Sequence, residues 1–477
     1  MERADVVIVG AGAVGTAIAR ELSRYRLKVI VCDKNEDVGG DASKSCSSCV
    51  ATAATMPVGP LEQKLRSISH PMVFDICRDL EVPIEKCGSL TLAITDEQYK
   101  NIPAWIAKAE KNGVFDAEIK TAAELLEMEP HLNPEVKGGI YVARDSQINQ
   151  FLFVVAMAEN AAENGVEFRL ECPVTDIAVS DGNIDYVDTP KGKIKTDWVI
   201  NAAGLYCDDI ADMVGLRDFT VHPRRGEFYV LDRNTSVKVK HIIRSVPGGS
   251  GHGTLIIPTV DNNILVGPNA EDIEDKLDKR TTREGLESVK EQALELVPGL
   301  NFKDTITQFV GLRPAREPEG YSFVVSDKVK GYVGISGIRS TGLTSSPGIA
   351  LHTLELMKQA GLVLEKKDHF NKYRKGIVSL TGKSVEEMDQ LIAADSKYGR
   401  IICRCEKITE AEIVQSINRP VGARSVDAVK RRVRAGMGRC QGGFCSPSVI
   451  EILARELGIS EEDIRKRGGT SFMLKQL

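Results

Sequence analysis

The stretch VVIVGAGAVGTAIARELSRYRLKVIVCD, residues 6–33, decides the fold of the front part of this chain. Its first four residues are continuously apolar, as a strand buried on both faces of a parallel sheet requires. A glycine-rich turn at 10–15 follows at once, a helix is predicted over 16–25, and a second apolar strand over 27–32 ends at Asp33. This order of strand, glycine turn, helix and strand with an acidic end predicts a βαβ unit that binds a dinucleotide.

Each glycine of this turn has its own expected task. Gly10 permits the tight turn, Gly12 lets the backbone approach a pyrophosphate, and Gly15 lets the helix pack closely on the strand. The amide groups at the start of the helix favour an anion, and Asp33 is expected to accept hydrogen bonds from ribose hydroxyls. A glycine turn that holds no ligand is the alternative interpretation.

Three later stretches favour FAD over NAD as the dinucleotide. Residues 39–43, GGDAS, continue from the second strand as a loop of small residues that can lie over a ribityl chain. Residues 198–204, WVINAAG, form an apolar strand that ends in small residues, as if the backbone touched a ligand. Residues 337–347, GIRSTGLTSSP, repeat the glycine-to-helix design, and a helix that begins there could face the flavin ring.

The first ~360 residues resemble the flavoprotein family of D-amino-acid oxidase and glycerol-3-phosphate dehydrogenase. The resemblance is carried, in order, by the glycine motif, the NAAG stretch at 201–204, Arg225-Gly-Glu227, Gly311-Leu-Arg-Pro314 and residues 337–347. It implies an α/β fold in which a Rossmann-like FAD domain, with FAD bound non-covalently, is interrupted by an inserted, sheet-based substrate domain. The predicted cofactor-binding residues are Gly10, Ala11, Gly12, Ala13, Val14, Gly15, Asp33, Lys34, Ser43, Val174, Ala203, Gly204, Gly311, Gly337, Gly342, Leu343 and Thr344.

Four cysteines near the end of the chain suggest a metal centre. Cys403 and Cys405 are followed, 34 residues later, by Cys440 and Cys445. Two close pairs of thiolates suit a tetrahedral-sulfur site of zinc or of iron–sulfur type, and the spacing alone does not choose between them. The region resembles the small [2Fe–2S] domain of the bacterioferritin-associated ferredoxin type, which also occurs fused to catalytic subunits of anaerobic glycerol-3-phosphate dehydrogenases. This resemblance implies a [2Fe–2S] cluster on the four cysteines, in a small and mainly helical domain.

A basic run precedes the second cysteine pair, and the residues from Ser396 to the end carry a net charge of +7 in a chain whose total is −5. We expect these cations either to stabilise the negatively charged cluster, to form a solvated helix face, or to form a docking face for a partner. The total charge and the lack of interleaved aromatic residues argue against nucleic acid as a ligand. The residues of the run are Lys430, Arg431, Arg432, Arg434 and Arg439.

The composition and the motifs together predict four parts. They are an oxidoreductase part at 1–365, with a substrate part inserted roughly at 76–144 and 216–309, a linker at 366–397, a [2Fe–2S] domain at 398–460, and a tail at 461–477.

Arginines are the predicted catalytic residues. In the family that this chain resembles, the arginine of the Gly-Leu-Arg-Pro motif binds a substrate carboxylate or phosphate, which implies this role for Arg313. Arg339 is expected to be a second anion contact or to hold the flavin pyrimidine edge, and Arg225 is a weaker candidate. Related glycerol-phosphate dehydrogenases usually carry histidine where this chain has Ala51. That difference leaves a polyol phosphate, another 2-hydroxy acid, and an amino acid or amine open as substrates.

Cys46 and Cys49 form a Cys-x-x-Cys pair in the same loop as Ala51. They are interpreted either as a redox dithiol beside the flavin or, preferably, as two buried small residues. The other five cysteines show no pairing pattern and are expected in the core, and His252 is expected to be a solvent-facing loop residue. Those five are Cys32, Cys77, Cys87, Cys172 and Cys207.

These features predict an FAD-dependent dehydrogenase. A small anionic substrate, such as glycerol 3-phosphate or a 2-hydroxy acid, gives a hydride to flavin N5, and electrons leave singly through the [2Fe–2S] cluster to a separate iron–sulfur or flavin subunit. An oxidase that discharges to oxygen would not need the cluster. The alternatives are an amino-acid or amine dehydrogenase, a dithiol oxidoreductase that uses Cys46 and Cys49, and a non-catalytic electron carrier or redox sensor.

The expected location is the cytoplasm. The uncharged stretch from Val6 to Ala19 is 14 residues long, too short to cross a bilayer, and no cationic segment precedes it. Eleven cysteines are an odd number, which suits ligands and free thiols in a reducing compartment. Any membrane association is expected through a partner subunit.

Overall fold

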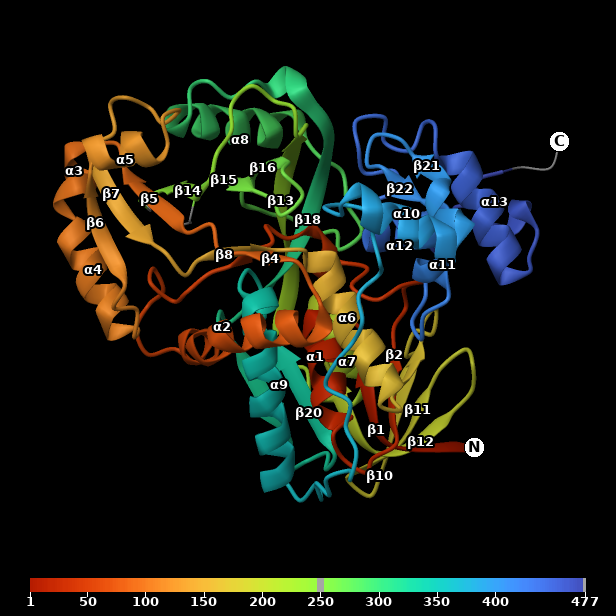
Figure 1. The fold of residues 1–477 in the computed structure, drawn as a ribbon. Helices are drawn as coiled ribbons and strands as arrows, with labels where there is room; N and C mark the ends of the chain where they lie inside the picture. Colours follow the sequence, from red (N-terminus) through yellow and green to blue (C-terminus); the bar gives the residue numbers. More distant parts are fainter. Residues whose placement is uncertain (247–252, 475–477) are drawn as a thin grey trace.

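Five parallel strands form the centre of the first sheet in the computed structural model, which describes residues 1–246 and 253–474 (Figure 1). Their order is β9 (Glu167–Arg169), β2 (Val29–Cys32), β1 (Glu2–Val9), β12 (Ile194–Asn201) and β20 (Tyr332–Ser336). β10 (Asp176–Ser180), β11 (Asn183–Asp188) and β19 (Ser322–Val325) extend the sheet to eight strands in antiparallel pairings.

Both faces of this sheet are buried, which explains the continuous apolar run at its centre. Val6 and Ile8 pack under α1 (Ala13–Leu22), α6 (Gln150–Glu163) and α9 (Gly342–Gln359). Val7 and Val9 point to the opposite face, whose apolar cluster includes residues of α7 (Cys207–Met213) and of the hairpin β10–β11. α2 (Leu61–Leu80) packs on α9.

A second sheet of nine strands is built from two insertions between strands of the first sheet. Its strand order is β17–β13–β16–β15–β14–β5–β7–β6, with β18 on the other side of β13. One insertion supplies β5 (Ser89–Ala93), β6 (Ala117–Thr121) and β7 (Gly138–Val142). The other supplies β13 (Thr220–Leu231), β14 (Ile242–Ser245), β15 (Leu255–Pro258), β16 (Ile264–Gly267), β17 (Glu271–Asp272) and β18 (Thr305–Glu317). α8 (Arg283–Leu296) packs on this sheet through an apolar core of its own.

Three short helices accompany the first insertion, α3 (Asp96–Lys100), α4 (Ile102–Lys111) and α5 (Ala122–Met128). α3 and α4 are divided at Asn101, because Pro103 cannot donate a backbone hydrogen bond and instead lies in the first turn of α4. A three-stranded sheet of β3 (Cys49–Val50), β8 (Ser146–Ile148) and β4 (Ile84–Glu85) joins the insertion to the loop after the glycine motif.

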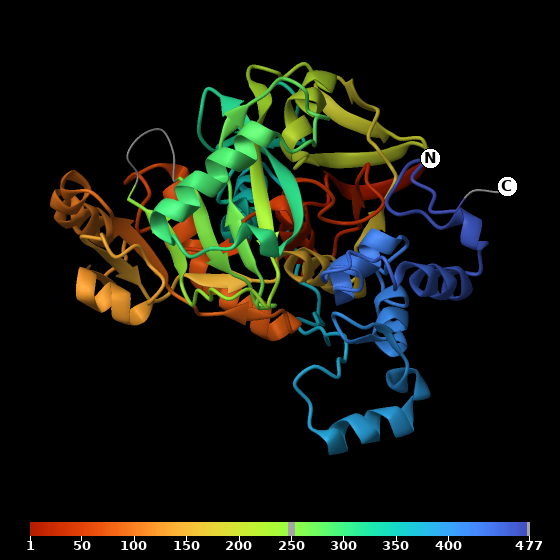
Figure 2. The ribbon, with the colours of Figure 1, turned by 90° about the horizontal axis from the view of Figure 1, so that it is seen from above.

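The last part of the chain is small and mainly helical. It contains α10 (Val385–Ala394), β21 (Ile401–Cys403), β22 (Ile408–Thr409), α11 (Glu410–Ile417), α12 (Val426–Val433) and α13 (Ser446–Leu457). α11, α12 and α13 share an apolar core that also holds two of the four predicted cysteine ligands. α10 has no buried residue and projects from the body of the molecule (Figure 2).

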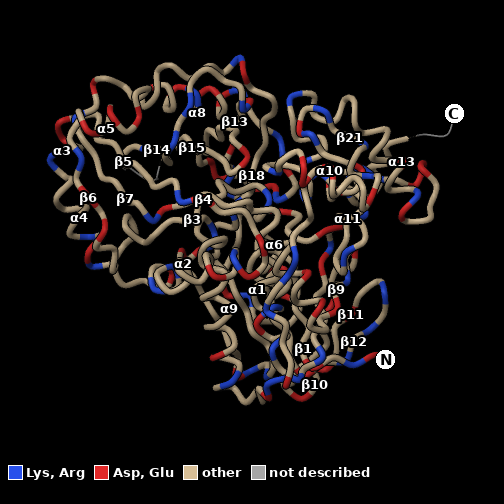
Figure 3. Tube along the Cα trace, viewed as in Figure 1, with Lys and Arg blue, Asp and Glu red and all other residues tan. Residues whose placement is uncertain are grey.

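The fold class is confirmed: a Rossmann-like α/β part, an inserted sheet-based part and a small helical part. The exact limits assigned to these parts from the sequence stay a prediction. Lysine and arginine are interspersed with aspartate and glutamate along the whole trace (Figure 3). Within 1–246 and 253–474, no helix is both long and apolar enough to span a membrane.

Candidate functional site

The glycine turn has the geometry that a close ligand requires. Gly10 holds φ at +106°, and a Cβ there would lie 2.6 Å from the carbonyl oxygen of Ala202. A Cβ on Gly15 would overlap the carbonyl oxygen of Gly10, at 1.9 Å. α1 therefore starts directly above the end of β1. Gly12, the residue before α1, has no side chain that could cover the first turn of the helix.

Two side chains fix the loops on either side of α1. The Ala13 N–H donates to Ser43 Oγ at 3.0 Å, which ties the 39–43 loop to the start of the helix. Asp33 accepts from the Ala11 N–H at 2.6 Å and from the Asn35 N–H at 2.8 Å. Burial raises the pKa of Asp33, and these two N–H donors oppose that rise.

A cavity of about 260 Å³ opens at this point, and Gly10 and Gly12 of the glycine turn line it. Eight predicted cofactor-binding residues line it: Gly10, Gly12, Asp33, Lys34, Ser43, Val174, Ala203 and Gly204. Asp41 and Tyr206 also line it and were not predicted. Both contact Lys34, whose ammonium lies 3.0 Å from the Asp41 carboxylate and 4.4 Å from the centre of the Tyr206 ring. Tyr206 follows the predicted NAAG stretch by two residues, which is the only sequence signal that pointed to it.

The remaining predicted cofactor residues do not line this cavity. Ala11, Ala13, Val14 and Gly15 lie in the glycine turn and the start of α1, whereas Gly311 and Thr344 contact the loop at 43–52. A Cβ on Gly311 would lie 2.2 Å from the Ser45 carbonyl oxygen, so β18 passes directly over the loop. The Thr344 Oγ1 donates to the Cys49 carbonyl oxygen at 3.2 Å. Gly342 and Leu343 form the first turn of α9, and Gly337, at φ +75°, makes the turn before it.

Arg313 lies on β18, opposite Arg224 of β13. Its Nε donates to the carbonyl oxygen of Arg224 at 3.4 Å, and its Nη2 donates to those of Arg225 and Asn269 at 3.1 and 2.7 Å. Burial, together with Arg224 and Arg339, lowers the pKa of Arg313 to about 10. No carboxylate of the described residues forms an ion pair with Arg313, and its Nη1 has no partner among them, so this cation lacks a counter-ion.

The other two arginine candidates are paired. Arg339 forms an ion pair with Glu319. Arg225 is buried, and its guanidinium contacts Asp278 at 2.5 Å and Glu271 at 3.2 Å. Arg313 is therefore the predicted arginine with free capacity to bind an anion, whereas an anion on Arg339 must compete with Glu319.

A buried polar cluster behind the loop was not predicted. Arg66 of α2 donates from Nε to the Ala51 carbonyl oxygen at 2.7 Å and has no ion-pair partner in the part of the chain that the structure describes. Asp145 accepts from the Thr52 N–H at 2.6 Å, and Arg244 of β14 lies 3.4 Å from the same carboxylate. The Thr52 hydroxyl is buried without a hydrogen-bond partner. No sequence signal could have found this cluster, because its members lie far apart along the chain.

The cysteines of this loop are free thiols. Burial raises the pKa of Cys46 to about 11 and also raises that of Cys49, so the reactive thiolate form is disfavoured at neutral pH. Cys32, Cys77, Cys172 and Cys207 are buried as expected, whereas Cys87 is half-buried. His252 lies outside the described residues.

The four cysteines near the end of the chain come together. The Sγ atoms of Cys403 and Cys405 are 3.9 Å apart, and those of Cys405 and Cys440 are 3.6 Å apart. The Cys445 thiol, then the backbone N–H groups of Gly436 and Glu406, lower the pKa of Cys403 to about 5. These thiols form a chain of contacts, and no set of three His, Cys, Asp or Glu side chains in 1–246 or 253–474 encloses a single metal ion.

The backbone beside these thiols is glycine-rich for a steric reason. A Cβ on Gly438 would lie 2.7 Å from the Cys405 sulfur, and Gly436 and Gly442 both hold φ at +91°. The donor set, four sulfurs with converging backbone amides, fits an iron–sulfur cluster.

The prediction of a solvated helix face is wrong for Arg431 and Arg432. Both are buried, and both donate to the Asp37 carboxylate, at 2.8 Å from Arg431 and 2.7 Å from Arg432. Asp37 follows Asp33 on the loop that lines the dinucleotide cavity. The basic helix α12 therefore faces the front part of the chain because a buried carboxylate lies there.

Arg434 and Arg439 make the same kind of contact. Arg434 pairs with Asp261 at 2.7 Å and with Glu406 at 2.8 Å, and Arg439 pairs with Asp232 at 3.2 Å. Through Asp261 and Asp232, these two arginines attach the small domain to the inserted part.

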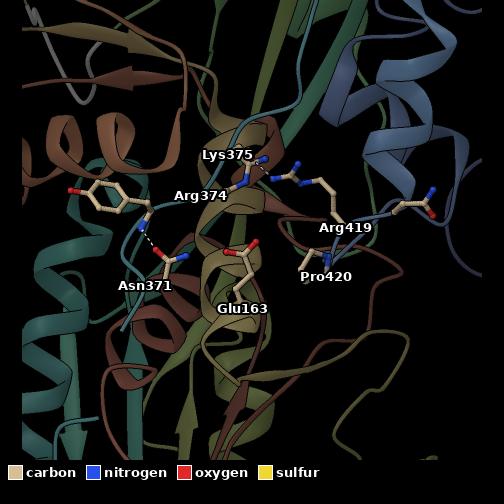
Figure 4. Close-up of a pocket in the computed structure, with 8 residues that line it drawn as sticks. Glu163, Asn371, Arg374, Lys375, Arg419 and Pro420 are labelled. Atoms are coloured by element: carbon tan, nitrogen blue, oxygen red, sulfur yellow. Dashed lines mark hydrogen bonds between the residues drawn. The ribbon is translucent and has the colours of Figure 1, made fainter. Parts of the chain in front are cut away.

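A second cavity, of about 700 Å³, lies where α6, the connecting segment and the small domain meet (Figure 4). Glu163 of α6 lines it, together with Arg374 and Arg419. These two arginines pair with Glu159 of the same helix, which is fully buried and lies 2.7 Å from Arg419. It shares no lining residue with the dinucleotide cavity, and it marks a joint between parts of the chain.

The sequence matches two family models. Residues 5–356 match the FAD dependent oxidoreductase family, and residues 401–455 match the BFD-like [2Fe-2S] binding domain. These matches confirm FAD and a [2Fe–2S] cluster as the cofactors of this chain.

Named relatives agree with both matches. The chain is 43% identical over 98% of its length, and 98% of the relative's, to a glycerol 3-phosphate dehydrogenase of Caloramator mitchellensis. It is 25% identical, over 95% of its length and 83% of the relative's, to the anaerobic glycerol-3-phosphate dehydrogenase subunit A1 of Haloferax volcanii.

Its fold also matches solved structures. The FAD-bound L-alpha-glycerophosphate oxidase of Mycoplasma pneumoniae superposes with a TM-score of 0.72 at 27% identity, over 78% of this chain and 98% of the other. Since the family model covers most of the sequence, the chain belongs to the FAD dependent oxidoreductase family and carries a BFD-like [2Fe–2S] domain at its C-terminal end.

Proposed function

We propose that this chain is a dehydrogenase that oxidises a polyol phosphate of the glycerol 3-phosphate type and releases electrons through its [2Fe–2S] cluster to a separate protein. The observation that carries this proposal is the buried pairing of Asp37 with Arg431 and Arg432. It holds the four-cysteine domain against the loop that follows Asp33, so one fold keeps both cofactor sites together. The names of the relatives favour the polyol phosphate over other anions.

Bound FAD supplies a two-electron acceptor for a substrate hydride, and the bound cluster supplies a one-electron carrier. The residues of the chain position these groups. The start of α1 and the Asp33 carboxylate would hold the pyrophosphate and the ribose of bound FAD, and the start of α9 lies against the loop at 43–52. Arg313 binds the substrate anion through its free Nη1, and Arg339 is a second contact that competes with Glu319.

Ala51 leaves this loop without the imidazole that related enzymes usually carry. Arg66 lies beside that position, because its Nε donates to the Ala51 carbonyl oxygen. We assign to Arg66 the task of keeping positive charge next to the substrate hydroxyl, where a developing oxyanion is stabilised as its proton leaves. The half-buried thiols of Cys46 and Cys49 have no part in this proposed reaction.

The proposed partner is a separate iron–sulfur or flavin subunit that accepts one electron at a time. The Haloferax volcanii relative is described as a subunit, which supports an assembly of this kind. All eleven cysteines are free thiols, which suits a cytoplasmic protein, with any membrane contact made by the partner.

The test is anaerobic bleaching of the flavin absorbance by glycerol 3-phosphate, lactate and glycine. We expect bleaching by glycerol 3-phosphate, and we expect Arg313→Ala to weaken substrate binding by tenfold or more while Arg224→Ala does not. Arg224 is a matched control because it faces Arg313 across the strand pair but pairs with Asp272. Bleaching by glycine alone would replace this proposal with the amine dehydrogenase. Rapid oxygen consumption by the reduced enzyme would replace it with an oxidase.

A further inference from the structure

The four-cysteine site is open to solvent on one edge only. Cys403 and Cys445 are buried, with 0% and 2% of their surface exposed. Cys405 and Cys440 are partly exposed, and their Sγ atoms lie 3.6 Å apart. The edge that these two thiols share is therefore the part of the site nearest to another molecule.

Exposed cations border this edge. Arg404 precedes Cys405 and Lys407 follows it by two residues, while Arg439 precedes Cys440. No carboxylate in the described part of the chain pairs with Arg404 or Lys407. Arg439 makes a single contact, with Asp232 at 3.2 Å, and stays 59% exposed.

An aromatic side chain stands in the same loop. Phe444 lies between Cys440 and Cys445 in the sequence and is 84% exposed, the most exposed large apolar side chain among the described residues. An exposed aromatic residue surrounded by charged groups is typical of the centre of an interface rather than of a bare surface.

Elsewhere in this domain the basic side chains are mostly neutralised within the chain. Arg400 pairs with Glu410, Arg465 with Glu171 and Lys466 with Asp427, in addition to the contacts of Arg431, Arg432 and Arg434 given above. Among the described residues of this domain, the cations without an ion pair are Arg404, Lys407, Arg424, Lys430 and Arg467, and of these Arg404 and Lys407 flank the partly exposed Cys405 in the sequence.

We propose that Phe444, Arg404, Lys407 and Arg439 form a docking surface for the acidic face of a small one-electron carrier protein. The inference rests on the proposed function and names the partner's chemistry. Phe444 supplies the apolar contact, and the cations steer and orient an acidic partner over the exposed thiol edge. Oxidation of one alcohol group to a carbonyl removes two electrons and two protons. Two carrier molecules each accept one electron here in turn, and the protons go to solvent.

The test compares two cytochromes of opposite charge as acceptors for the holoenzyme, with glycerol 3-phosphate as donor. Cytochrome b5 presents an acidic face and cytochrome c a basic one, and dichlorophenolindophenol serves as a small dye. We expect faster reduction of cytochrome b5, with a rate that falls as salt rises. In the double variant Arg404→Glu/Lys407→Glu, the ratio of cytochrome b5 reduction to dye reduction falls tenfold or more, and the ratio for cytochrome c rises. Phe444→Ala lowers the cytochrome b5 ratio severalfold.

Binding provides a readout that does not depend on turnover. The equilibrium dissociation constant for cytochrome b5 is measured with the oxidised holoenzyme, after the cluster absorbance confirms that each variant is loaded. The control is Lys100→Glu/Lys137→Glu, which makes the same change of charge at exposed residues of the inserted part. An equal loss of affinity in the control, or no loss in the Arg404/Lys407 variant, overturns the docking surface. If the Arg404/Lys407 variant loses binding to vesicles of anionic lipid but not to cytochrome b5, the surface binds a membrane, and the proposal of a carrier protein as the partner is overturned.

Failure of the proposed function gives a different result. If glycerol 3-phosphate reduces neither the dye nor a cytochrome, the substrate assignment fails, while the binding comparison still decides whether the surface exists.

Discussion

At the scale of single residues, the dinucleotide cavity depends on positions where only glycine fits. Gly10 combines a φ of +106° with a distance of only 2.6 Å between the position that a Cβ would take and the Ala202 carbonyl oxygen. Either feature alone is tolerable in a loop, but together they leave no room for a side chain at the first glycine of the turn.

Gly10→Ala is expected to abolish FAD retention, because the new methyl group displaces either the strand end at Ala202 or the start of α1. The measurement is the ratio of flavin to protein absorbance after gel filtration. Gly59→Ala is the matched control, since Gly59 has the same φ of +106° but no atom within 4 Å of the Cβ position. A variant at Gly10 that keeps its full flavin content would show that the turn does not limit the site.

Arg66→Met is expected to lower kcat/KM by roughly tenfold to a hundredfold, since the substitution removes a buried charge and the hydrogen bond to the Ala51 carbonyl oxygen, together worth about 1.5–3 kcal/mol. Dye-linked steady-state kinetics measure it. Arg78→Met on the same helix is the control, because the Arg78 side chain is 67% exposed. Equal kinetics for the two variants would remove Arg66 from the reaction.

The sequence predicted a role for Gly10 but not for Arg66, for a physical reason. Gly10 and Asp33 belong to one local unit whose turn chemistry is determined by neighbouring residues. Arg66, Asp145 and Arg244 meet only because α2 and the inserted sheet both pack on the loop at 43–52. Contacts across such separations depend on tertiary packing, which residue spacing does not encode.

At the scale of elements, α12 decides how the small domain is attached. Its sequence was predicted to be helical and basic, yet the pattern could not show which acid its arginines would meet. Arg432 is buried and donates to Asp37 and to the carbonyl oxygens of Ala428 and Val421, while its Nε has no partner among the described residues. The burial of a charged helix face against another part of the chain is invisible in the sequence because the counter-ion lies almost 400 residues away.

Asp37→Asn is expected to destabilise the native state by about 3–5 kcal/mol, because it leaves the buried Arg432 without a counter-ion and Arg431 with Glu36 alone. Urea unfolding measures the loss, and faster proteolysis within the connecting segment accompanies it. Asp427→Asn is the control. Asp427 lies in α12, the helix that carries Arg431 and Arg432, and its ion pair with Lys466 is partly exposed and worth at most about 1 kcal/mol. Equal stability of both variants would mean that the Asp37 pair does not hold the domain.

At the scale of the whole molecule, two buried ion clusters join the small domain to the rest. One is Asp37 with Arg431 and Arg432, and the other is Glu159 with Arg374 and Arg419. Both carboxylates come from elements of the first sheet's layer, the loop after β2 and helix α6. The composition change near residue 396 predicted a separate unit here, but nothing in the composition predicted so rigid an attachment.

The Asp37 cluster makes the stability depend on pH in a defined window. Burial opposes ionisation of Asp37, but Arg432 and Arg431 outweigh it and lower the pKa from 3.8 to about 2. A carboxylate with a lowered folded-state pKa stabilises the protein above its unfolded pKa and loses this contribution as the pH falls toward the folded value. The difference in unfolding free energy between the wild type and Asp37→Asn is therefore expected to be constant above about pH 5 and to shrink toward pH 2. Urea titrations of both proteins at a series of pH values measure it, and a difference that grows on acidification contradicts the assignment.

The joint has a consequence for how fast the enzyme works. A domain that moves between an electron donor and an electron acceptor moves more slowly as the viscosity of the solvent rises, because each movement is diffusive. Here the carboxylate of Asp37, four residues beyond Asp33, holds the cysteine domain through buried ion pairs with Arg431 and Arg432. We then expect electron transfer between the two cofactors to have the same rate in concentrated sucrose as in dilute buffer. Only the rate at which the separate carrier protein binds is expected to fall as the viscosity rises.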